Sequence, residues 1–549
     1  MSHKLIISFL TIFMLTFTSC QDEFLTRTPT NAISASAALA SVENMQLVLN
    51  GIHRSMFSQS QTIFPGGNTA IANDHWYTAQ GDNLAGIIIH SASANNLGWR
   101  DNMQWLHHTV PTSLSLEIMW YHRYNIILHA NLLINGIPES GFAQTPELQE
   151  ILGQAYTYRA FAYLSLVQHY ARGYLIGNPT TDPGVPLLFA TEPPYSSQPR
   201  STVEEIYVQI GLDLDAAITA FATGTGRTGS GPSAKNQLNV NVAHGLKARW
   251  ALSKGDWAQA AASAVAARAG FPLMDEAAWL SGFNTNSLSE VIWGSNVIET
   301  ETTFFRSYFY LMCNTFNGSQ NRSNPKIADR RMVDAIPATD FRRKAFLADA
   351  PNTNNSAANA QGGFANNTNP LYPTLADWNA AIAAIKAQYG MVSGHNLHPY
   401  MSVKHLQKNP GTIDPDDVIY MRSAEMYLIE AEAEAMQGNI GAAQTALAAL
   451  VDTRDTAFDE TIYNTQQLLM DQIKFQRHLE LWGEGFGYTD KIRWDEGIDH
   501  AANGGSGASQ VLYQAAYQVE RPSLNNAWIF KIPQAEINAN PNLSADGQN

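Results

Sequence analysis

Apolar side chains recur at helical spacing along most of the chain, and this periodicity constrains the fold more than any other feature. In the segment 41–51, for example, Val42, Met45 and Leu49 fall on one face of a helix. The same pattern recurs in six further stretches, which are Glu117–Ile137, Glu147–Tyr170, Val203–Phe221, Val240–Ala269, Met421–Val451 and Leu468–Trp482. Strand patterns are few, so the sequence predicts a mostly α-helical protein.

Two of these stretches contain an internal repeat. The positions that superpose at identical spacing are Ala248, Gly255, Asp256 and Ala260 in one stretch and Ala431, Gly438, Asn439 and Ala443 in the other. Small residues let two helices approach closely, and Gly-Asp or Gly-Asn makes the tight turn between them. The repeat predicts helical hairpins of the tetratricopeptide (TPR) kind, although Ala-rich hairpins also occur in ordinary helical bundles.

The 549 residues allow three or four domains or one large body built from repeats. TPR-like helices are expected mainly within residues 32–269 and 416–490 in either case. The intervening region 270–415 is rich in Asn, Gly, Pro, Thr and aromatic residues, so loops concentrate there. Because long loops on a rigid scaffold are often functional, a ligand site is expected in this region.

The N-terminus predicts secretion. Lys4 precedes an apolar run over residues 5–17, which is too short to span a membrane, and Thr18 and Ser19 lead directly into Cys20. This pattern resembles the lipobox of bacterial lipoproteins, with a signal peptide over residues 1–19, an acylated Cys20 and a tether over residues 20–31. A plain secreted protein with a free thiol is the alternative. With Cys20 acylated, Cys313 has no disulfide partner and is expected to be a small buried residue.

Charge and motifs exclude several classes of function. The balance of 33 basic and 48 acidic residues gives a net charge of −15, and the chain has no basic stripe of the kind that nucleic-acid binding needs. The pattern G-x-G-x-x-G at residues 224–229 follows a helix instead of a strand, so it predicts a linker between helices. No zinc-ligand spacing and no G-x-S-x-G motif occur. We therefore predict no metal and no cofactor, and these motifs offer no catalytic nucleophile, while two carboxylates brought together from distant segments remain an alternative.

Aromatic residues interleaved with amides and carboxylates provide the best candidate site. They cluster in residues 74–83, 99–105 and 304–310. An aromatic ring suits the apolar face of a sugar, and Asn, Asp and Arg can hydrogen bond its hydroxyls. For any single ring, packing in the core is the alternative. The predicted ligand-contacting residues are Trp76, Tyr77, Asp82, Asn83, Trp99, Asn102, Trp105, Phe305 and Tyr308.

Motifs in a fixed order resemble those of one family over nearly the whole chain. They are Cys20-Gln-Asp-Glu-Phe-Leu25, Pro29-Thr-Asn-Ala-Ile-Ser34, Trp120-Tyr-His-Arg-Tyr124, Tyr158-Arg-Ala-Phe-Ala-Tyr163, Arg422-Ser-Ala-Glu-Met-Tyr-Leu-Ile-Glu-Ala-Glu-Ala433, Glu480-Leu-Trp-Gly-Glu-Gly485, Tyr488-Thr-Asp490, Ile492-Arg-Trp494 and Ile532-Pro-Gln-Ala-Glu-Ile-Asn-Ala-Asn-Pro-Asn-Leu543. Together they resemble the SusD/RagB family, the surface lipoproteins of Bacteroidetes nutrient uptake.

The resemblance implies a single SusD-like body over residues 32–549, an α-helical superhelix without catalytic activity. It also implies a lipid-anchored position on the outer membrane, facing the cell exterior. Such a protein binds an oligo- or polysaccharide and delivers it to a SusC-like TonB-dependent transporter. RagB-like capture of peptides, a TPR interaction scaffold and a glycoside hydrolase with two facing carboxylates are alternatives.

The C-terminal motifs themselves are expected to be scaffold. We predict that Arg422, Glu425, Glu480 and Glu484 pair across helices and do not touch ligand. Gln476 and Gly487 stand where the family usually has Glu and Arg, so the charged network is expected to be thinner here.

Overall fold

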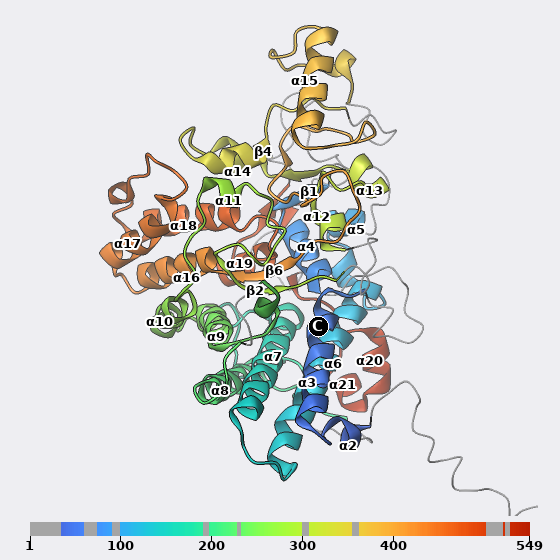
Figure 1. Ribbon diagram of the computed structural model, residues 1–549, viewed down its shortest axis with the longest axis vertical. Coiled ribbons are helices and arrows are strands. Elements are labelled where there is room, and N and C mark those ends of the chain that lie inside the picture. Colours follow the sequence, from blue (N-terminus) through green and yellow to red (C-terminus); the bar gives the residue numbers. More distant parts are fainter. Residues whose placement is uncertain are drawn as a thin grey trace, which may run out of the picture.

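The computed structural model describes residues 34–59, 74–90, 99–189, 197–227, 232–298, 307–353, 362–500, 520–521 and 528–549. The predicted signal peptide, Cys20 and the tether lie outside these ranges. The described part of the chain is mostly helical, with TPR-like hairpins, as the periodicity predicts (Figure 1).

The first helices of the chain build the lower half of the molecule in Figure 1 and reach its centre. They are α2 (Ala35–Ala38), α3 (Val42–Phe57), α4 (Asp74–Leu84), α5 (Trp99–Met103), α6 (Leu114–Glu139), α7 (Pro146–Tyr170), α8 (Val203–Phe221), α9 (Val240–Lys254) and α10 (Trp257–Ala267). Local signals set their ends. Helix α8, for example, begins after Thr202, whose side chain and that of Glu205 form a capping box.

The next helices pack beside this layer, from the left of Figure 1 to its centre, and they are α16 (Ser423–Met436), α17 (Ile440–Val451), α18 (Gln466–Glu480) and α19 (Gly487–Arg493). The last two helices, α20 (Gln534–Ala539) and α21 (Pro541–Asp546), lie at the lower right of the figure. The internal repeat is confirmed as two hairpins, α9–α10 and α16–α17. Gly255 and Gly438 turn them with φ of 78° and 79°, a left-handed conformation that glycine adopts without strain. The four alanines of the repeat are fully buried.

The segment 270–415, which separates the two helical stretches in the sequence, holds mostly short elements. Its helices are α11 (Glu276–Trp279), α12 (Tyr308–Met312), α13 (Ser319–Ser323), α14 (Arg330–Asp334) and α15 (Leu375–Gln388). The strands of the described chain are β1 (Ile88–His90), β2 (Val291–Ser295), β3 (Lys326–Ala328), β4 (Phe346–Leu347), β5 (Met401–Ser402), β6 (Val418–Arg422), β7 (Ile498–Asp499) and β8 (Glu520–Arg521). They pair antiparallel, in a sheet of order β1-β3-β5-β4 and in the pairs β2-β6 and β7-β8.

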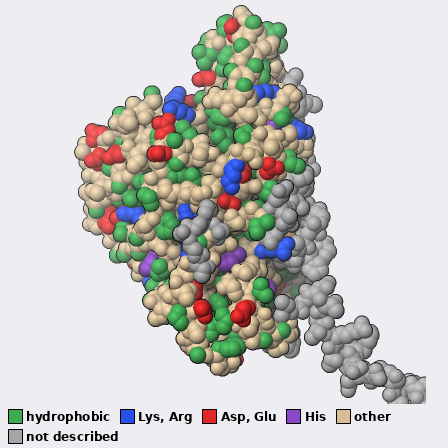
Figure 2. All heavy atoms as spheres, viewed as in Figure 1, with side chains coloured by type: hydrophobic (Ala, Val, Ile, Leu, Met, Phe, Trp, Pro, Cys, Tyr) green, Lys and Arg blue, Asp and Glu red, His purple; other side chains and the backbone are tan. Residues whose placement is uncertain are grey.

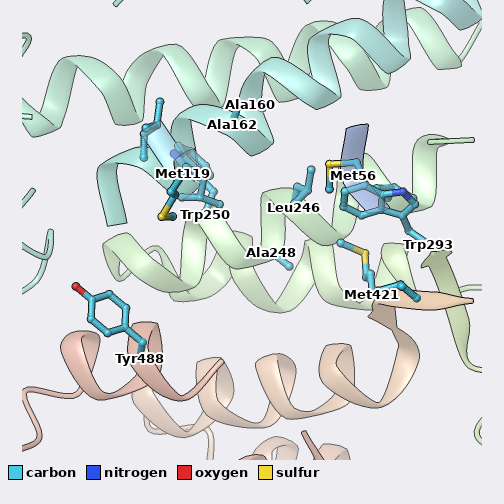
Figure 3. Packing of buried hydrophobic residues seen from close by; sticks show 14 of the residues in the cluster. Met56, Met119, Ala160, Ala162, Leu246, Ala248, Trp250, Trp293, Met421 and Tyr488 are labelled. Carbon is cyan, nitrogen blue, oxygen red and sulfur yellow. The ribbon is translucent and has the colours of Figure 1, made fainter. Parts of the chain in front are cut away.

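The main hydrophobic core runs through both helical layers. Figure 3 shows part of it, where Leu246 and Ala248 of α9 lie near Trp293 of β2 and Met421 of β6. A second cluster fills the space between α16, α17 and α18, and a small third one lies beneath α15. Cys313 belongs to the main core and is a free, fully buried cysteine, which confirms the expectation for it.

Bidentate ion pairs join neighbouring helices inside this core. Arg159 of α7 donates two hydrogen bonds to Asp213 of α8, at 2.8 and 2.6 Å. Arg249 of α9 likewise donates two hydrogen bonds to Glu425 of α16, both at 2.7 Å. The prediction that Glu425 pairs across helices is therefore confirmed, and this pair connects the two helical layers.

The surface carries few charges for its size. On the face in Figure 2, the described Lys and Arg side chains are scattered and form no stripe. None of the helices in the described ranges combines the length and the apolarity that crossing a membrane would take.

Candidate functional site

A buried cluster of charged side chains lies where the loop region meets the C-terminal helices. Its members, called the central ion cluster below, are Glu290, Asp340, Arg342, Lys404, Arg422, Arg454, Glu480 and Glu484. Glu480 is its hub. Its carboxylate accepts hydrogen bonds from Arg342 at 2.8 Å, from Arg422 at 2.6 Å and from the indole of Trp279 at 3.0 Å. The predicted pairing of Arg422, Glu480 and Glu484 is confirmed.

The charges in this cluster stabilise one another. Burial alone would raise the pKa of Glu484, but the charges of Arg422 and Lys404 outweigh it and lower that pKa to about 2. Burial lowers the pKa of Lys404 to about 8. The ammonium of Lys404 also donates to the carbonyls of Glu480 and Trp482, at 2.8 Å each. The cluster therefore fixes the chain from Glu480, the last residue of α18, to Glu484.

Helix α4 is attached to this same stretch of chain. Asp82 of α4 is buried, and its carboxylate accepts the backbone N–H groups of Gly485 and Gly487 at 2.9 and 2.8 Å. A Cβ on Gly487 would lie 2.6 Å from Ile87 and 2.9 Å from the Asp82 carboxylate. Only glycine leaves room for this contact, which is a physical reason for the departure from Arg at position 487.

Three further predicted residues fix the surroundings of α4. Asn102 of α5 accepts a hydrogen bond from Gln80 at 3.3 Å, and Asn83 donates to the carbonyl of Ile88 at 2.9 Å. The indole of Trp105 donates to the carbonyl of Leu84 at 3.1 Å. Its ring meets Trp528 edge-on, with a centroid distance of 4.3 Å. These contacts hold α5 and the start of β1 against α4.

Tyr308 attaches α12 in the same way. Its hydroxyl lies 2.9 Å from Nε2 of His405 and donates to the carbonyl of Gly483 at 3.1 Å. Helix α4 thus contacts α5, β1, α12 and α19, and all of these lie near the centre of Figure 1.

The structure brings together the elements that carry the predicted residues, but not every side chain as a ligand contact. Asp82, Asn83, Asn102, Trp105 and Tyr308 are at most 5% exposed and hydrogen bonded within the protein. Their hydrogen bonds hold the backbone or a neighbouring side chain in this conformation, and direct contact of these five residues with a ligand stays a prediction. Trp76 and Tyr77 lie on α4 and Trp99 begins α5, whereas Phe305 lies outside the described residues.

A cleft of about 490 Å³ lies beside the end of α4. Its apolar lining includes Ile87, Met332 of α14 and Phe475 of α18. Arg331 and Lys491 add charge, and this size is in the range of small-molecule sites. These residues could not be found from the sequence, because they come from segments far apart in the chain and form no local pattern. Within the described ranges, no three His, Cys, Asp or Glu side chains are grouped to hold a metal ion.

The Asp82 contact predicts a pH effect on stability. Burial raises the pKa of Asp82 from 3.8 to about 7, against the lowering effect of the two amide N–H groups. The stabilisation from this group is therefore complete below about pH 4 and is lost as the pH rises through 7. The Asp82→Asn variant removes the titrating group, so the stability advantage of the native protein over the variant should shrink from pH 5 to pH 8. Urea unfolding at both pH values measures this, and an advantage that stays constant would contradict it.

Comparison with known proteins identifies the architecture. A family model described as the SusD family matches residues 282–549, and one described as starch-binding associating with outer membrane matches residues 62–226. A SusD-like protein of Formosa agariphila, P38, is 31% identical over 110 residues. That match spans 20% of this chain and only 19% of the relative's length.

Solved structures cover nearly the whole chain. A SusD-like carbohydrate-binding protein of Bacteroides vulgatus superposes with a TM-score of 0.71 at 20% identity, covering 92% of this chain and 98% of that one. A SusD superfamily protein of Bacteroides thetaiotaomicron gives 0.67 at 22% identity, with coverages of 91% and 98%. Surface glycan-binding protein A of Bacteroides fluxus gives 0.62 at 17%, with 91% and 96%. Family models at both ends of the chain and this common fold agree with the sequence motifs: the chain belongs to the SusD family.

Proposed function

We propose that this protein binds an oligo- or polysaccharide at the outer surface of the cell and passes it to a SusC-like TonB-dependent transporter. The observation that carries the proposal is the convergence of α4, α5 and α12, which bear the predicted aromatic residues, on one anchored patch. The cleft beside α4 supplies space for sugar rings next to that patch. The family description as starch-binding supports this ligand class.

In the proposed binding mode, aromatic rings form the platform and buried residues hold it in place. We assign stacking on sugar rings to Trp76, Tyr77 and Trp99, with Phe305 as a further contact. An aromatic face suits the C–H face of a sugar. Binding then depends on a fixed arrangement of these elements, which is the role of Asp82 and its neighbours. No bond is broken in this process, so the proposal describes a binding protein and not an enzyme.

The proposed location follows from the predicted lipid on Cys20. The family description includes association with the outer membrane, which supports an anchored protein. Acyl chains that each bury many methylene groups, at about 0.8 kcal/mol per group, would hold it firmly there. Co-purification of a large outer-membrane barrel with the anchored protein would support the transporter as partner, and its absence from crosslinked membranes would contradict delivery.

The glycan hypothesis is tested by affinity electrophoresis through gels that contain different polysaccharides. The form with residues 21–549 is used, because every described contact lies within it. Retardation by one glycan is expected, and Trp99→Ala should weaken binding about 30-fold, the effect of losing about 2 kcal/mol from a central tryptophan contact. Phe475→Ala tests the cleft beside α4 in the same gels.

Trp257→Ala is the matched control, since this half-buried tryptophan lies on α10 in the hairpin layer. It should leave retardation unchanged. A protein that no glycan slows, but that binds a peptide digest, would contradict the sugar hypothesis in favour of peptide capture. Release of shorter oligosaccharides during the assay would indicate a hydrolase.

A further inference from the structure

A second, smaller cleft lies between the two helical layers, at the first residue of α4 instead of beside the end of that helix. Its volume is about 150 Å³, and its lining comes from α4, α6, α7, α9, β2, β6, α16, α18, α19 and residues 484–486. Figure 3 shows three of the apolar lining residues, Met119, Leu246 and Trp293. Nothing in the proposed glycan site uses this cleft.

The carboxylates that line this cleft are already occupied. Glu425 accepts both hydrogen bonds of the Arg249 pair, and Asp74 is paired with Arg123. Asp490 accepts from Arg477 at 2.9 and 3.0 Å and also from Arg493, whereas Glu484 is held by Arg422 and Lys404. The carboxylates of the lining are therefore engaged with protein donors.

Hydrogen-bond donors remain available in the same lining. Arg249 uses Nε and Nη2 for Glu425 and for the carbonyl of Tyr420, and its Nη1 has no partner among the described contacts. The side-chain amide of Gln168 also makes no hydrogen bond with the described residues. Both side chains are half-buried, so their N–H groups are partly withdrawn from water. A ligand that accepts hydrogen bonds would satisfy them.

Aromatic rings cover one face of two guanidinium groups of the lining, those of Arg249 and Arg123. The guanidinium carbon of Arg249 lies 5.0 Å from the centroid of the Phe486 ring, and that of Arg123 lies 4.7 Å from the Phe161 ring. Both rings line the cleft. A ring that stacks on a guanidinium covers one of its faces. The N–H groups at the edge stay accessible and can donate to an acceptor that lies in the guanidinium plane.

Size and charge define the class of ligand. A cavity of about 150 Å³ holds a molecule as small as benzene, so a whole sugar chain does not fit. The lining contains four arginines and four carboxylates, so the charges of these side chains balance. We infer that this cleft is a binding site for one small anion, inorganic or carboxylate, held by Arg249 and Gln168 with modest affinity.

The test measures thermal unfolding of residues 21–549 at constant ionic strength, with sodium gluconate replaced stepwise by chloride, nitrate or acetate. A saturable rise of a few degrees in Tm is expected with at least one anion. Arg249→Gln and Gln168→Leu should each reduce that rise, whatever their basal Tm. Gln168→Leu breaks no described hydrogen bond, so it is the variant that keeps the fold intact.

Arg268→Gln is the matched control. Arg268 also stacks on a ring, Tyr427, and pairs with a glutamate, Glu430, but it does not line the cleft. Its variant should keep the full anion-dependent rise. A rise with chloride and nitrate alone identifies an inorganic anion, and a rise with acetate alone identifies a carboxylate group.

Crystals soaked in sodium bromide give an independent readout if halides raise Tm. Anomalous density at hydrogen-bonding distance from Arg249 and Gln168 is then expected. Equal rises in the native protein and both cleft variants, or no rise with any anion, would overturn the inference. These outcomes are separate from glycan retardation, which does not depend on this cleft.

Discussion

Replacing Glu480 by glutamine is expected to lower the free energy of unfolding by about 3 to 5 kcal/mol, the cost of removing one partner from a buried ion pair. The central ion cluster balances four cations with four carboxylates, all in the protein interior. The variant keeps the shape of the side chain and an acceptor for Trp279, but it leaves one positive charge without compensation. Arg342, Arg422 and Arg454 all lose part of their stabilisation together.

Equilibrium unfolding in urea measures the Glu480→Gln effect. The control is Glu276→Gln, which breaks the exposed pair between Glu276 and Lys344, whose side chains are 48% and 64% exposed. An exposed pair contributes under about 1 kcal/mol because water and salt screen it. A Glu480→Gln variant as stable as the Glu276→Gln variant would contradict a structural role for the cluster.

Helix positions could be predicted well because the amphipathic period is a local property of the chain. The expected helix Val203–Phe221 coincides with α8, and Glu147–Tyr170 differs from α7 by one residue. The stretch Val240–Ala269 is divided in two at Gly255, where the repeat places its turn. The spacing of apolar residues therefore predicts the helices, and the repeated small residues predict how these helices pair into hairpins.

The candidate site was only partly predictable, because local composition does not show which side chains face water. Asp82 stands in a polar, aromatic segment, yet its partners are backbone amides some 400 residues later in the chain. Trp105 finds its ring partner, Trp528, near the other end of the protein. No pattern around either residue encodes these long-range contacts. Asp82, Asn83 and Asn102 are predicted as ligand contacts, and the structure buries all three with hydrogen bonds inside the protein.

The scaffold and the proposed site meet at Trp482. This residue lies in the motif after α18, and the carbonyl of Trp482 accepts a hydrogen bond from Lys404 of the central ion cluster. The indole of Trp482 donates to the carbonyl of Ile87 at 2.9 Å, just before β1. The side chain is fully buried. One residue thus connects the ion cluster with the segment that carries α4, β1 and the proposed aromatic platform.

Trp482→Ala is therefore expected to destabilise the protein by about 3 to 5 kcal/mol, as large-to-small core changes at tryptophan do. It should also weaken glycan retardation, because the carbonyl of Ile87 loses its partner and the chain between α4 and β1 loses its packing. Hydrogen exchange followed by mass spectrometry should show faster exchange in residues 84–90. These local amides are the part of the site that depends on the indole directly.

Trp378→Ala is the matched control for this prediction. Trp378 lies on α15, at the top of Figure 1 and away from α4. It is 4% exposed, and its ring packs edge-on against the rings of Phe364 and Tyr372. This variant removes the same ring, so it should also lower stability, but exchange in residues 84–90 should stay as in the native protein. If both variants accelerate exchange there equally, the effect is global. The proposed connection from Trp482 to the glycan platform would then be wrong. A local contact predicts that loss of the Trp482 ring speeds exchange in residues 84–90 more than loss of the Trp378 ring does.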